Sequence, residues 1–507
     1  MRLKINGKKC AQNFKSHFIF KENYFKIMDT TGYAPEEPIA AIATSLAPAA
    51  LGIIRASGKN TIELVSKIFS RPEVLKSAQG NSIVYGWIVE PSKNDIPIPG
   101  MGMEKKSVEK IDEVLISVFR APKSFTGEEM AEISCHGGTA IVMKIFDLLL
   151  QNGFRKAERG EFTFRAYING KTDLTKAEAV REIIESRTNI SSQKAAGRLA
   201  GNLFEEISRI KKLLVETLAQ IEVEIEYPED EETIADAFDK EKLFEAKRAL
   251  EILNASWRSE KLFQEGARIV LCGKTNAGKS SLFNALLKEE RAIVSDLEGT
   301  TRDWIESWIS IDGIPARLFD TAGLRQTSDK VELRGLEATR ELSADADLIL
   351  YLADNSLAEE KIDFEFIRAR NEKIIFVWNK IDKTNSQKRI SLSDEDKSKI
   401  KNFCGEIFVS AKNGEGIKDL IQKIKSVLLG GAQTERTQAG LGSARQKHLV
   451  QNALENVSHA LLVSEDFSLD AVVQDLEDAL DALGEITGEV TSNDILENIF
   501  ANFCVGK

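Results

Sequence analysis

The hydrophobic pattern divides the chain into stretches with different periods. Between residues 39 and 150, short apolar runs separated by Gly and Pro predict the strands of an α+β domain. These runs are Ile39–Ala43, Leu51–Arg55, Val114–Phe119 and Ala131–Cys135. From Thr175 a helical period begins and continues to about Gln264, and the string Thr175-Lys-Ala-Glu178 fits a capping box. A long helical region is therefore predicted to follow the α+β domain.

A second α/β region interrupts the helical pattern. Its strand-like runs alternate with helical segments, as in a doubly wound parallel sheet. The runs are Ala267–Cys272, Asp347–Leu352, Lys373–Trp378 and Glu406–Val409. Residues Ser443 to Ile499 are helical again, with Leu449, Ala453 and Val457 on one stripe. The simplest interpretation is a helical domain into which an α/β domain has been inserted. The predicted parts are 1–32, an extension; 33–155, the α+β domain; 156–265 and 431–507, the helical domain; and 266–430, the α/β domain.

Composition places the chain among multi-domain globular proteins. A length of 507 residues is enough for about three domains. The five cysteines form no C-x-x-C pair, which indicates a reducing, cytoplasmic setting, and we find no apolar run long enough to cross a bilayer. A net charge of -11 disfavours broad binding to nucleic acid but allows a local basic patch. The basic segment before Met28 fits neither a secretory signal nor a transit peptide; we interpret residues 1–32 as a disordered extension, or Met28 as the true start.

A phosphate-binding loop starts the inserted domain. The string Gly273-Lys-Thr-Asn-Ala-Gly-Lys-Ser280 is G-x-x-x-x-G-K-S, and it stands between a predicted strand and a predicted helix, the context that this motif requires. Backbone N–H groups of such a loop surround phosphates, Lys279 reaches the outer phosphates, and the Ser280 hydroxyl can ligate Mg²⁺. Nucleotide contacts are therefore predicted for Asn276, Ala277, Gly278, Lys279, Ser280 and Ser281.

Four further motifs lie on the C-terminal side of this loop. Asp320-Thr321-Ala322-Gly323 comes after a strand-like run, so Asp320 can hold Mg²⁺ through water and the Gly323 N–H can meet the γ-phosphate. Thr301 is the second candidate Mg²⁺ ligand, in a segment whose predicted nucleotide contacts are Ser295, Asp296, Leu297, Glu298, Gly299, Thr300 and Thr301. The Asp382 carboxylate of Asn379-Lys380-Ile381-Asp382 can accept from both donors of guanine, which adenine lacks, and Ser410-Ala411-Lys412 adds a backbone contact to the base. The chain is therefore predicted to bind and hydrolyse GTP with Mg²⁺.

Water positioning needs a separate explanation. The residue after Gly323 is Leu324, where many GTPases have the glutamine that orients the attacking water. Glu332 is the nearest candidate carboxylate, although on pattern alone a solvated helix residue is the simpler interpretation.

The chain resembles the tRNA wobble-uridine modification GTPase family MnmE, also called TrmE. The resemblance runs from about Ile39 to the last residue. It rests on Gly52-Ile-Ile-Arg55, Ser124-Phe-Thr-Gly127, His136-Gly-Gly138, Gly160-Glu-Phe-Thr163, Asn169-Gly-Lys-Thr-Asp-Leu174, Asn276-Ala-Gly-Lys-Ser-Ser281, Asp320-Thr-Ala-Gly-Leu-Arg325 and the terminal Phe503-Cys-Val-Gly-Lys507.

This resemblance implies a Ras-like, potassium-dependent GTPase that forms a homodimer. It implies joint action, as a heterotetramer, with a flavin-binding partner protein, MnmG (GidA). Together they would add an aminomethyl or carboxymethylaminomethyl group at C5 of uridine 34 of certain tRNAs. The carbon would come from a tetrahydrofolate, in its 5,10-methylene or 5-formyl form, bound by an N-terminal folate domain.

The resemblance also implies roles for single residues. Folate contacts would be Arg55, Glu132, Lys171 and Lys507. K⁺ ligands would be Asn276, Ser295, Leu297 and Thr300, and Glu332 would orient the water, which reverses the simpler interpretation above. Two departures from the family pattern, Ser45–Ala50 and Arg159, stand near the implied folate site. Cys504 is a candidate reactive residue, although a lone cysteine is more often unreactive.

Two other functions stay open at this point. One is a GTP-switched RNA-binding or ribosome-assembly protein without modification chemistry, but we find no KH-type G-x-x-G loop in a βα context. The other is a folate-binding scaffold whose chemistry belongs wholly to a partner. The sequence does not separate this from the modification GTPase.

Overall fold

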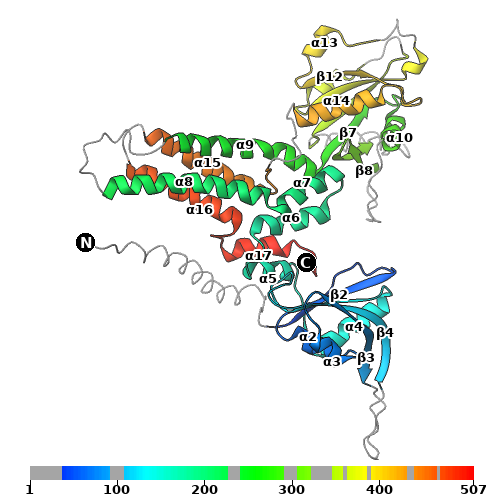
Figure 1. Cartoon of the computed structure of the whole chain (residues 1–507). Helices are drawn as coiled ribbons and strands as arrows, with labels where there is room; N and C mark the ends of the chain where they lie inside the picture. The colour runs from blue at the N-terminus through cyan, green and yellow to red at the C-terminus, as the bar shows by residue number, and fades with distance from the viewer. Residues whose placement is uncertain are drawn as a thin grey trace, which may run out of the picture. The chain divides into compact units, whose positions relative to one another are not determined.

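The computed structural model (Figure 1) describes residues 37–91, 108–226, 240–289, 305–320, 345–357, 362–384, 390–430, 439–464 and 469–506. It divides into two compact units. The N-terminal unit runs to Ala177 and takes in the chain again from Gly488, and the central unit is Glu178–Thr487. The domain boundaries drawn from the sequence stay a prediction.

The N-terminal unit is built on a six-stranded sheet of order β3-β4-β5-β2-β1-β6. All its neighbouring strands are antiparallel except β1 and β6, which are parallel. The core includes Ile54, Ile116, Ile133 and Ile145, from three strands and helix α4. The elements are β1 (Ile39–Ile42), β2 (Leu51–Ser57), α2 (Thr61–Ser66), α3 (Pro72–Ser77), β3 (Ser82–Pro91), β4 (Val108–Phe119), β5 (Met130–His136), α4 (Thr139–Gln151), β6 (Arg155–Lys156), α5 (Glu161–Ile168) and α17 (Asn493–Ala501). The α+β character predicted for this region is confirmed.

The C-terminal segment packs against α5. Phe500 of α17 lies edge-on to Phe164 of α5, with ring centroids 5.4 Å apart. Gly160 has φ +68°, and a Cβ there would lie 2.6 Å from the Phe500 carbonyl oxygen, so only glycine permits this approach. The tail then pairs with Arg159 through Val505. The last residues of the chain are thereby part of the N-terminal unit.

Helix α6 (Leu174–Glu185) runs from one unit into the other. The capping box predicted at Thr175 is wrong, because the helix begins one residue before it. Asp173 caps the helix instead: its carboxylate accepts from the Lys176 N–H at 3.0 Å and from the Thr175 hydroxyl. An aspartate binds the free N–H groups of a first turn at least as well as threonine does, so it takes the capping position.

The helical part of the central unit is a four-helix arrangement. The long helices α8 (Asn202–Glu226), α9 (Lys240–Glu265), α15 (Ala444–Val463) and α16 (Leu469–Thr487) lie side by side (Figure 1) and bury residues such as Leu214, Leu250, Val457 and Leu476. The short helix α7 (Asn189–Ala200) precedes them. The sequence-predicted helical regions on both sides of the inserted domain are confirmed.

The inserted domain, called the G domain below, has a six-stranded sheet of order β12-β11-β10-β7-β9-β8. Its elements are β7 (Ala267–Gly273), α10 (Lys279–Glu289), β8 (Ile305–Ile311), β9 (Ile314–Asp320), β10 (Leu348–Asp354), α12 (Phe364–Arg368), β11 (Ile374–Asn379), η3 (Ile381–Lys383), α13 (Asp394–Ser398), β12 (Phe403–Phe408) and α14 (Ile417–Leu429). The wholly parallel sheet of the prediction is wrong at one edge, where β8 is antiparallel to β9. A tight turn at Asp312-Gly313 joins these strands, which permits antiparallel pairing without a crossover helix.

The turn of this hairpin is anchored to the helical part of the central unit. Thr188, which caps α7, donates its hydroxyl hydrogen to the Gly313 carbonyl at 2.8 Å. Gly313 has φ +91°, and a Cβ there would lie 2.2 Å from the Ile190 side chain. The glycine therefore serves both the turn and the close approach of α7.

Candidate functional site

The phosphate-binding loop is held directly against the sheet by its glycines. Gly273 ends β7 with φ +129°, and a Cβ there would lie 2.2 Å from the Leu352 carbonyl oxygen of β10. Gly278 has φ +97°, and a Cβ there would lie 2.2 Å from the Asn379 amide nitrogen. Both positions therefore require glycine for backbone conformation and for space. The loop thus turns from the end of β7 into the first residue of α10, the arrangement that binds phosphate at a helix N-terminus.

Lys279, the first residue of α10, lies over this loop. Its buried ammonium donates to the carbonyl oxygens of Gly273 and Lys274, both at 2.8 Å. Two hydrogen bonds to the loop backbone fix the charge beside the backbone N–H groups that would surround the phosphates. Ser280 follows on the exposed side of the helix start, as a Mg²⁺-ligating hydroxyl requires.

Asp320 reaches the same edge of the sheet. It is the last residue of β9 and is almost wholly buried, and it pairs in register with Leu271 of β7, two residues before the phosphate loop begins. Because neighbouring parallel strands end at one edge, Asp320 lies at the same edge of the sheet as the loop.

Asn379 joins the phosphate loop to the segments predicted to read guanine. Its side chain, 1% exposed, donates from Nδ2 to the Ala277 carbonyl at 2.9 Å. Its Oδ1 accepts from the Ala411 N–H at 3.0 Å. One buried amide therefore fixes three motifs that are far apart in the sequence.

Lys380 strengthens the same link. Its ammonium donates to the Asn276 carbonyl and to the Asp354 carboxylate, both at 2.6 Å. Burial raises the pKa of Asp354, but the hydrogen bonds from Lys380 and Ser356 outweigh it, and the pKa lies below its usual value. Asp354 was not found from the sequence. It ends β10 after a fully apolar run, and a polar residue at the carboxyl end of a central parallel strand was the signal that could have found it.

Asp382 is oriented by the neighbouring motif. The buried Ser410 hydroxyl donates to Asp382 Oδ1 at 2.7 Å, and Asp382 lies in the short η3 helix that follows Lys380. A carboxylate held in this way can present its outer oxygen atoms to paired N–H donors of a base. The exposed Lys412 follows Ala411 at the same strand end.

Part of the predicted site lies outside the described residues. These predictions are Ser295, Asp296, Leu297, Glu298, Gly299, Thr300 and Thr301, then Thr321, Ala322, Gly323 and Glu332, and finally Lys507. The exposed Ser281 lies in α10, next to Ser280.

A second group of predicted residues meets in the N-terminal unit. Arg55 of β2 and Glu132 of β5 are directly opposite in the sheet, and their side chains pair at 2.7 Å. Arg55 also donates to the Gly506 carbonyl at 3.2 Å, and its guanidinium lies 5.4 Å from the centre of the Phe125 ring, a phenylalanine that is 40% exposed. Sequence reasoning named the string around Phe125 but gave this ring no role.

Lys171 and Cys504 have different surroundings. The Lys171 ammonium donates to the Pro122 carbonyl at 3.0 Å, and its stem lies beside Gly127, so it contacts the loop that carries Phe125. Cys504 is exposed, and its carbonyl accepts from the Gly160 N–H at 3.4 Å.

Both sequence departures lie beside the elements of this site. Ala49 and Ala50 exchange backbone hydrogen bonds with Gly137, just beyond β5, and Arg159 pairs with Val505 of the tail. The first departure therefore lies beside β5, which supplies Glu132, and the second lies beside the tail, which supplies Gly506.

None of the helices in the described ranges is both long enough and apolar enough to cross a membrane. The six-stranded sheet with its helices, the phosphate loop and the segments that Asn379 links to that loop together define a P-loop GTPase.

Comparison with known proteins identifies the family. A family model described as the MnmE helical domain matches residues 174–504, and one described as the GTP-binding protein TrmE N-terminus matches residues 38–171. The protein named tRNA modification GTPase MnmE of Treponema denticola is 51% identical over 484 residues, 94% of this chain and 99% of that one. The protein of the same name in Borreliella burgdorferi is 41% identical over 482 residues, which are 93% of this chain and 98% of that one. The chain therefore belongs to the MnmE family.

Among solved structures, a GTP-binding protein of Sulfolobus solfataricus in complex with GDP is similar with a TM-score of 0.27 and 21% identity, over 44% of this chain and 68% of that one.

Proposed function

We propose that this protein hydrolyses GTP to drive the modification of C5 of the wobble uridine, U34, of certain tRNAs. The general activity, GTP hydrolysis in tRNA modification, follows from the family to which the chain belongs. The members of that family compared above are named tRNA modification GTPases. The observation that carries the proposal is Asn379, which ties the phosphate loop to the guanine-reading segments. We infer that Lys279 holds the outer phosphates and that Asp382 selects guanine.

The hydrolytic step needs a positive charge and an oriented water. We propose that K⁺ supplies part of that charge and that Asn276 is one of its ligands, with Ser295, Leu297 and Thr300. Asn276 fits this role because it lies exposed in the phosphate loop with φ +64°. Mg²⁺ would be held by Ser280 and Thr301, with Asp320 acting through water. Glu332 would orient the attacking water.

The N-terminal unit would bind the folate. Tetrahydrofolate, when bound, supplies the one-carbon unit of the product. Arg55 suits the anionic tail of such a ligand, and Glu132 suits the donor edge of a pterin. The exposed ring of Phe125 lies beside Arg55 and offers a flat surface for the pterin. Lys171 and Lys507 are proposed to complete the site. A flavin-binding partner, in a heterotetramer with a homodimer of this chain, is proposed for the remaining chemistry.

A turnover experiment tests the hydrolytic part. GTP hydrolysis by the wild type should be faster in KCl than in NaCl at equal ionic strength. Glu332→Ala should lower kcat by about 100-fold, the scale of losing a positioned acid–base group, and leave GTP affinity nearly unchanged. Glu365→Ala, a change of an exposed glutamate on α12, is the matched control and should keep wild-type turnover. Equal rates in the two salts would contradict the potassium proposal, and wild-type turnover in Glu332→Ala would mean that another residue holds the water.

Nucleoside analysis tests the modification. Cells that lack this protein should accumulate wobble uridines without the C5 substituent. Unchanged U34 nucleosides would rule out the modification reaction while leaving the GTPase assignment intact.

A further inference from the structure

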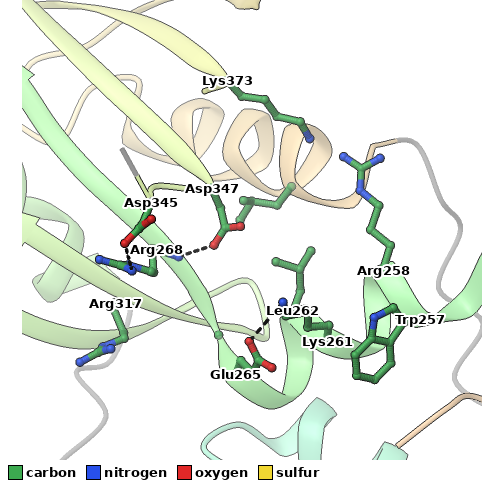
Figure 2. A pocket seen from close by; sticks show the side chains of 12 residues that line it. Trp257, Arg258, Lys261, Leu262, Glu265, Arg268, Arg317, Asp345, Asp347 and Lys373 are labelled. Atoms are coloured by element: carbon green, nitrogen blue, oxygen red, sulfur yellow. Dashed lines mark hydrogen bonds and ion pairs between the residues drawn. The ribbon is translucent and has the colours of Figure 1, made fainter. Parts of the chain in front are cut away.

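A cavity lies in the central unit, at the opposite edge of the G-domain sheet from the nucleotide motifs. Its volume is about 670 Å³. The last turns of α9 and the amino ends of the parallel strands β7, β10 and β11 line it (Figure 2). The nucleotide motifs follow the carboxyl ends of these same strands, at Gly273, Asp354 and Asn379. The cavity is therefore separate from the GTP site.

Most charges around this cavity are already paired. Asp345 pairs with the Arg268 guanidinium at 3.3 Å, and Asp347 accepts from the Arg268 backbone N–H at 2.8 Å. Lys261 and Glu265 are 3.6 Å apart on α9. Arg317 is the other arginine of the sheet that lines the cavity, and it forms an ion pair with Glu306 at 2.6 Å.

Two basic side chains are not neutralised in this way. Arg258, from α9, and Lys373, just before β11, extend toward one another across the cavity (Figure 2). In the described ranges of the chain, no carboxylate lies within ion-pair distance of either group; the Lys373 ammonium donates to the Val427 carbonyl at 2.6 Å. Burial lowers the pKa of Lys373 and the positive charge of Arg258 lowers it further, while Cys404 and Asp347 only partly oppose this shift. Two like charges that converge on a cavity repel one another, and an anion between them would relieve that repulsion.

We propose that this cavity is a second anion site, which binds a phosphate group between Arg258 and Lys373. Arginine offers a planar pair of N–H donors that matches phosphate oxygens, and lysine offers a compact point charge. Because Arg258 belongs to the helical part and Lys373 to the G domain, the bound phosphate bridges the two parts of the central unit. The phosphate belongs either to a small molecule or to an RNA backbone, and both sources share this chemistry.

Calorimetry on the full-length protein tests the site. The protein is first saturated with GDP and Mg²⁺, so that the nucleotide site is filled, and is then titrated with inorganic phosphate. A parallel titration uses a short single-stranded oligoribonucleotide. The variant Arg258→Gln/Lys373→Gln should weaken saturable binding by about tenfold or more, because both charge-assisted contacts are lost. The matched control, Lys261→Gln/Arg317→Gln, removes the same amount of charge from the same cavity wall and should change binding by less than about threefold.

The two titrations distinguish the sources. Specific weakening of phosphate binding alone assigns a small phosphorylated ligand, and specific weakening of oligoribonucleotide binding assigns an RNA phosphate. If wild type binds neither probe saturably, or if the two double variants weaken binding equally, the proposal is wrong. GDP binding by each variant serves as the check on folding. If the double variant does not fold, the single change Arg258→Gln, at an exposed position, takes its place and should weaken the same binding.

Discussion

Replacement of Asn379 by aspartate tests the link on which the nucleotide site depends. The two side chains have nearly the same shape, so packing is preserved. The new carboxylate can still accept from the Ala411 N–H. It cannot donate to the Ala277 carbonyl oxygen, which lies 2.9 Å from the Asn379 side-chain nitrogen in the wild type. The change therefore removes one buried hydrogen bond and sets two acceptors against each other.

The cost follows from that geometry. A buried polar group left without its partner costs about 1–3 kcal/mol. Asn379 is 1% exposed, so water does not readily replace the lost donor. The phosphate loop is then no longer held to the segment that carries Asn379 and Asp382, and the nucleotide itself must impose that arrangement when it binds. At about 1.4 kcal/mol per factor of ten, GDP and GTP should bind about 5- to 150-fold more weakly.

Equilibrium titration with a fluorescent GDP analogue measures this loss. Asn402→Asp is the matched control, because it makes the same chemical change at an exposed position of the G domain, where Asn402 donates to the Asn371 carbonyl. The control should bind within about twofold of the wild type, since a surface charge contributes little. Wild-type affinity in Asn379→Asp, or an equal loss in both variants, would refute the reasoning.

Asp382→Asn should weaken GTP binding and shift preference toward xanthosine triphosphate, because an amide donor suits a carbonyl rather than an amine; competition binding measures this, and unchanged GTP affinity would contradict it. Arg55→Ala should abolish calorimetric binding of 5-formyltetrahydrofolate while Arg71→Ala, on the same unit, should not; no binding by the wild type would refute the folate proposal. Burial raises the pKa of Glu182 from 4.5 to about 7, only partly opposed by Arg198, so the folded state binds this proton more tightly than the unfolded state. The free energy of unfolding should therefore fall as the pH rises from 4.5 to about 7, and Glu182→Gln should remove that part of the slope in denaturant titrations; an unchanged slope would place the titration elsewhere.

The nucleotide motifs were predictable because each is a short string at the end of one strand. Gly273, Asp320 and Asn379 end β7, β9 and β11, and parallel strands bring their carboxyl ends to one edge of the sheet. The contact that joins these motifs was not predictable. It depends on the side chain of Asn379 reaching Ala277 and Ala411, 102 and 32 residues away.

Strands β3, β6 and β8 were not predicted from the sequence; β6 has only two residues, and the other two were missed for identifiable reasons. Strand β3 has Gly86 at its centre, which lowers strand propensity, but a Cβ there would lie 2.4 Å from the Phe69 ring. The glycine is therefore needed for packing and is not a break in the strand. Within the described part of the chain, strand β8 lies at the edge of the sheet and pairs with β9 alone, and its antiparallel direction comes from the short turn at Gly313.

The contacts of Arg55 were only partly predictable from the sequence. Arg55 and Glu132 are opposite one another in the sheet, so alternation along two neighbouring strands could have paired them once β2 and β5 were aligned. The Gly506 carbonyl is 451 residues from Arg55, and no local pattern predicts their contact. The tail reaches this position because Phe503 packs on Phe500 and because Gly160 leaves room for that helix end. The contact between Arg55 and the tail can therefore form only after the helical and G-domain segments have been made. A truncated chain that ends before α17 should keep the sheet that carries Arg55 and Glu132. It should lack the Gly506 carbonyl that holds the arginine in place.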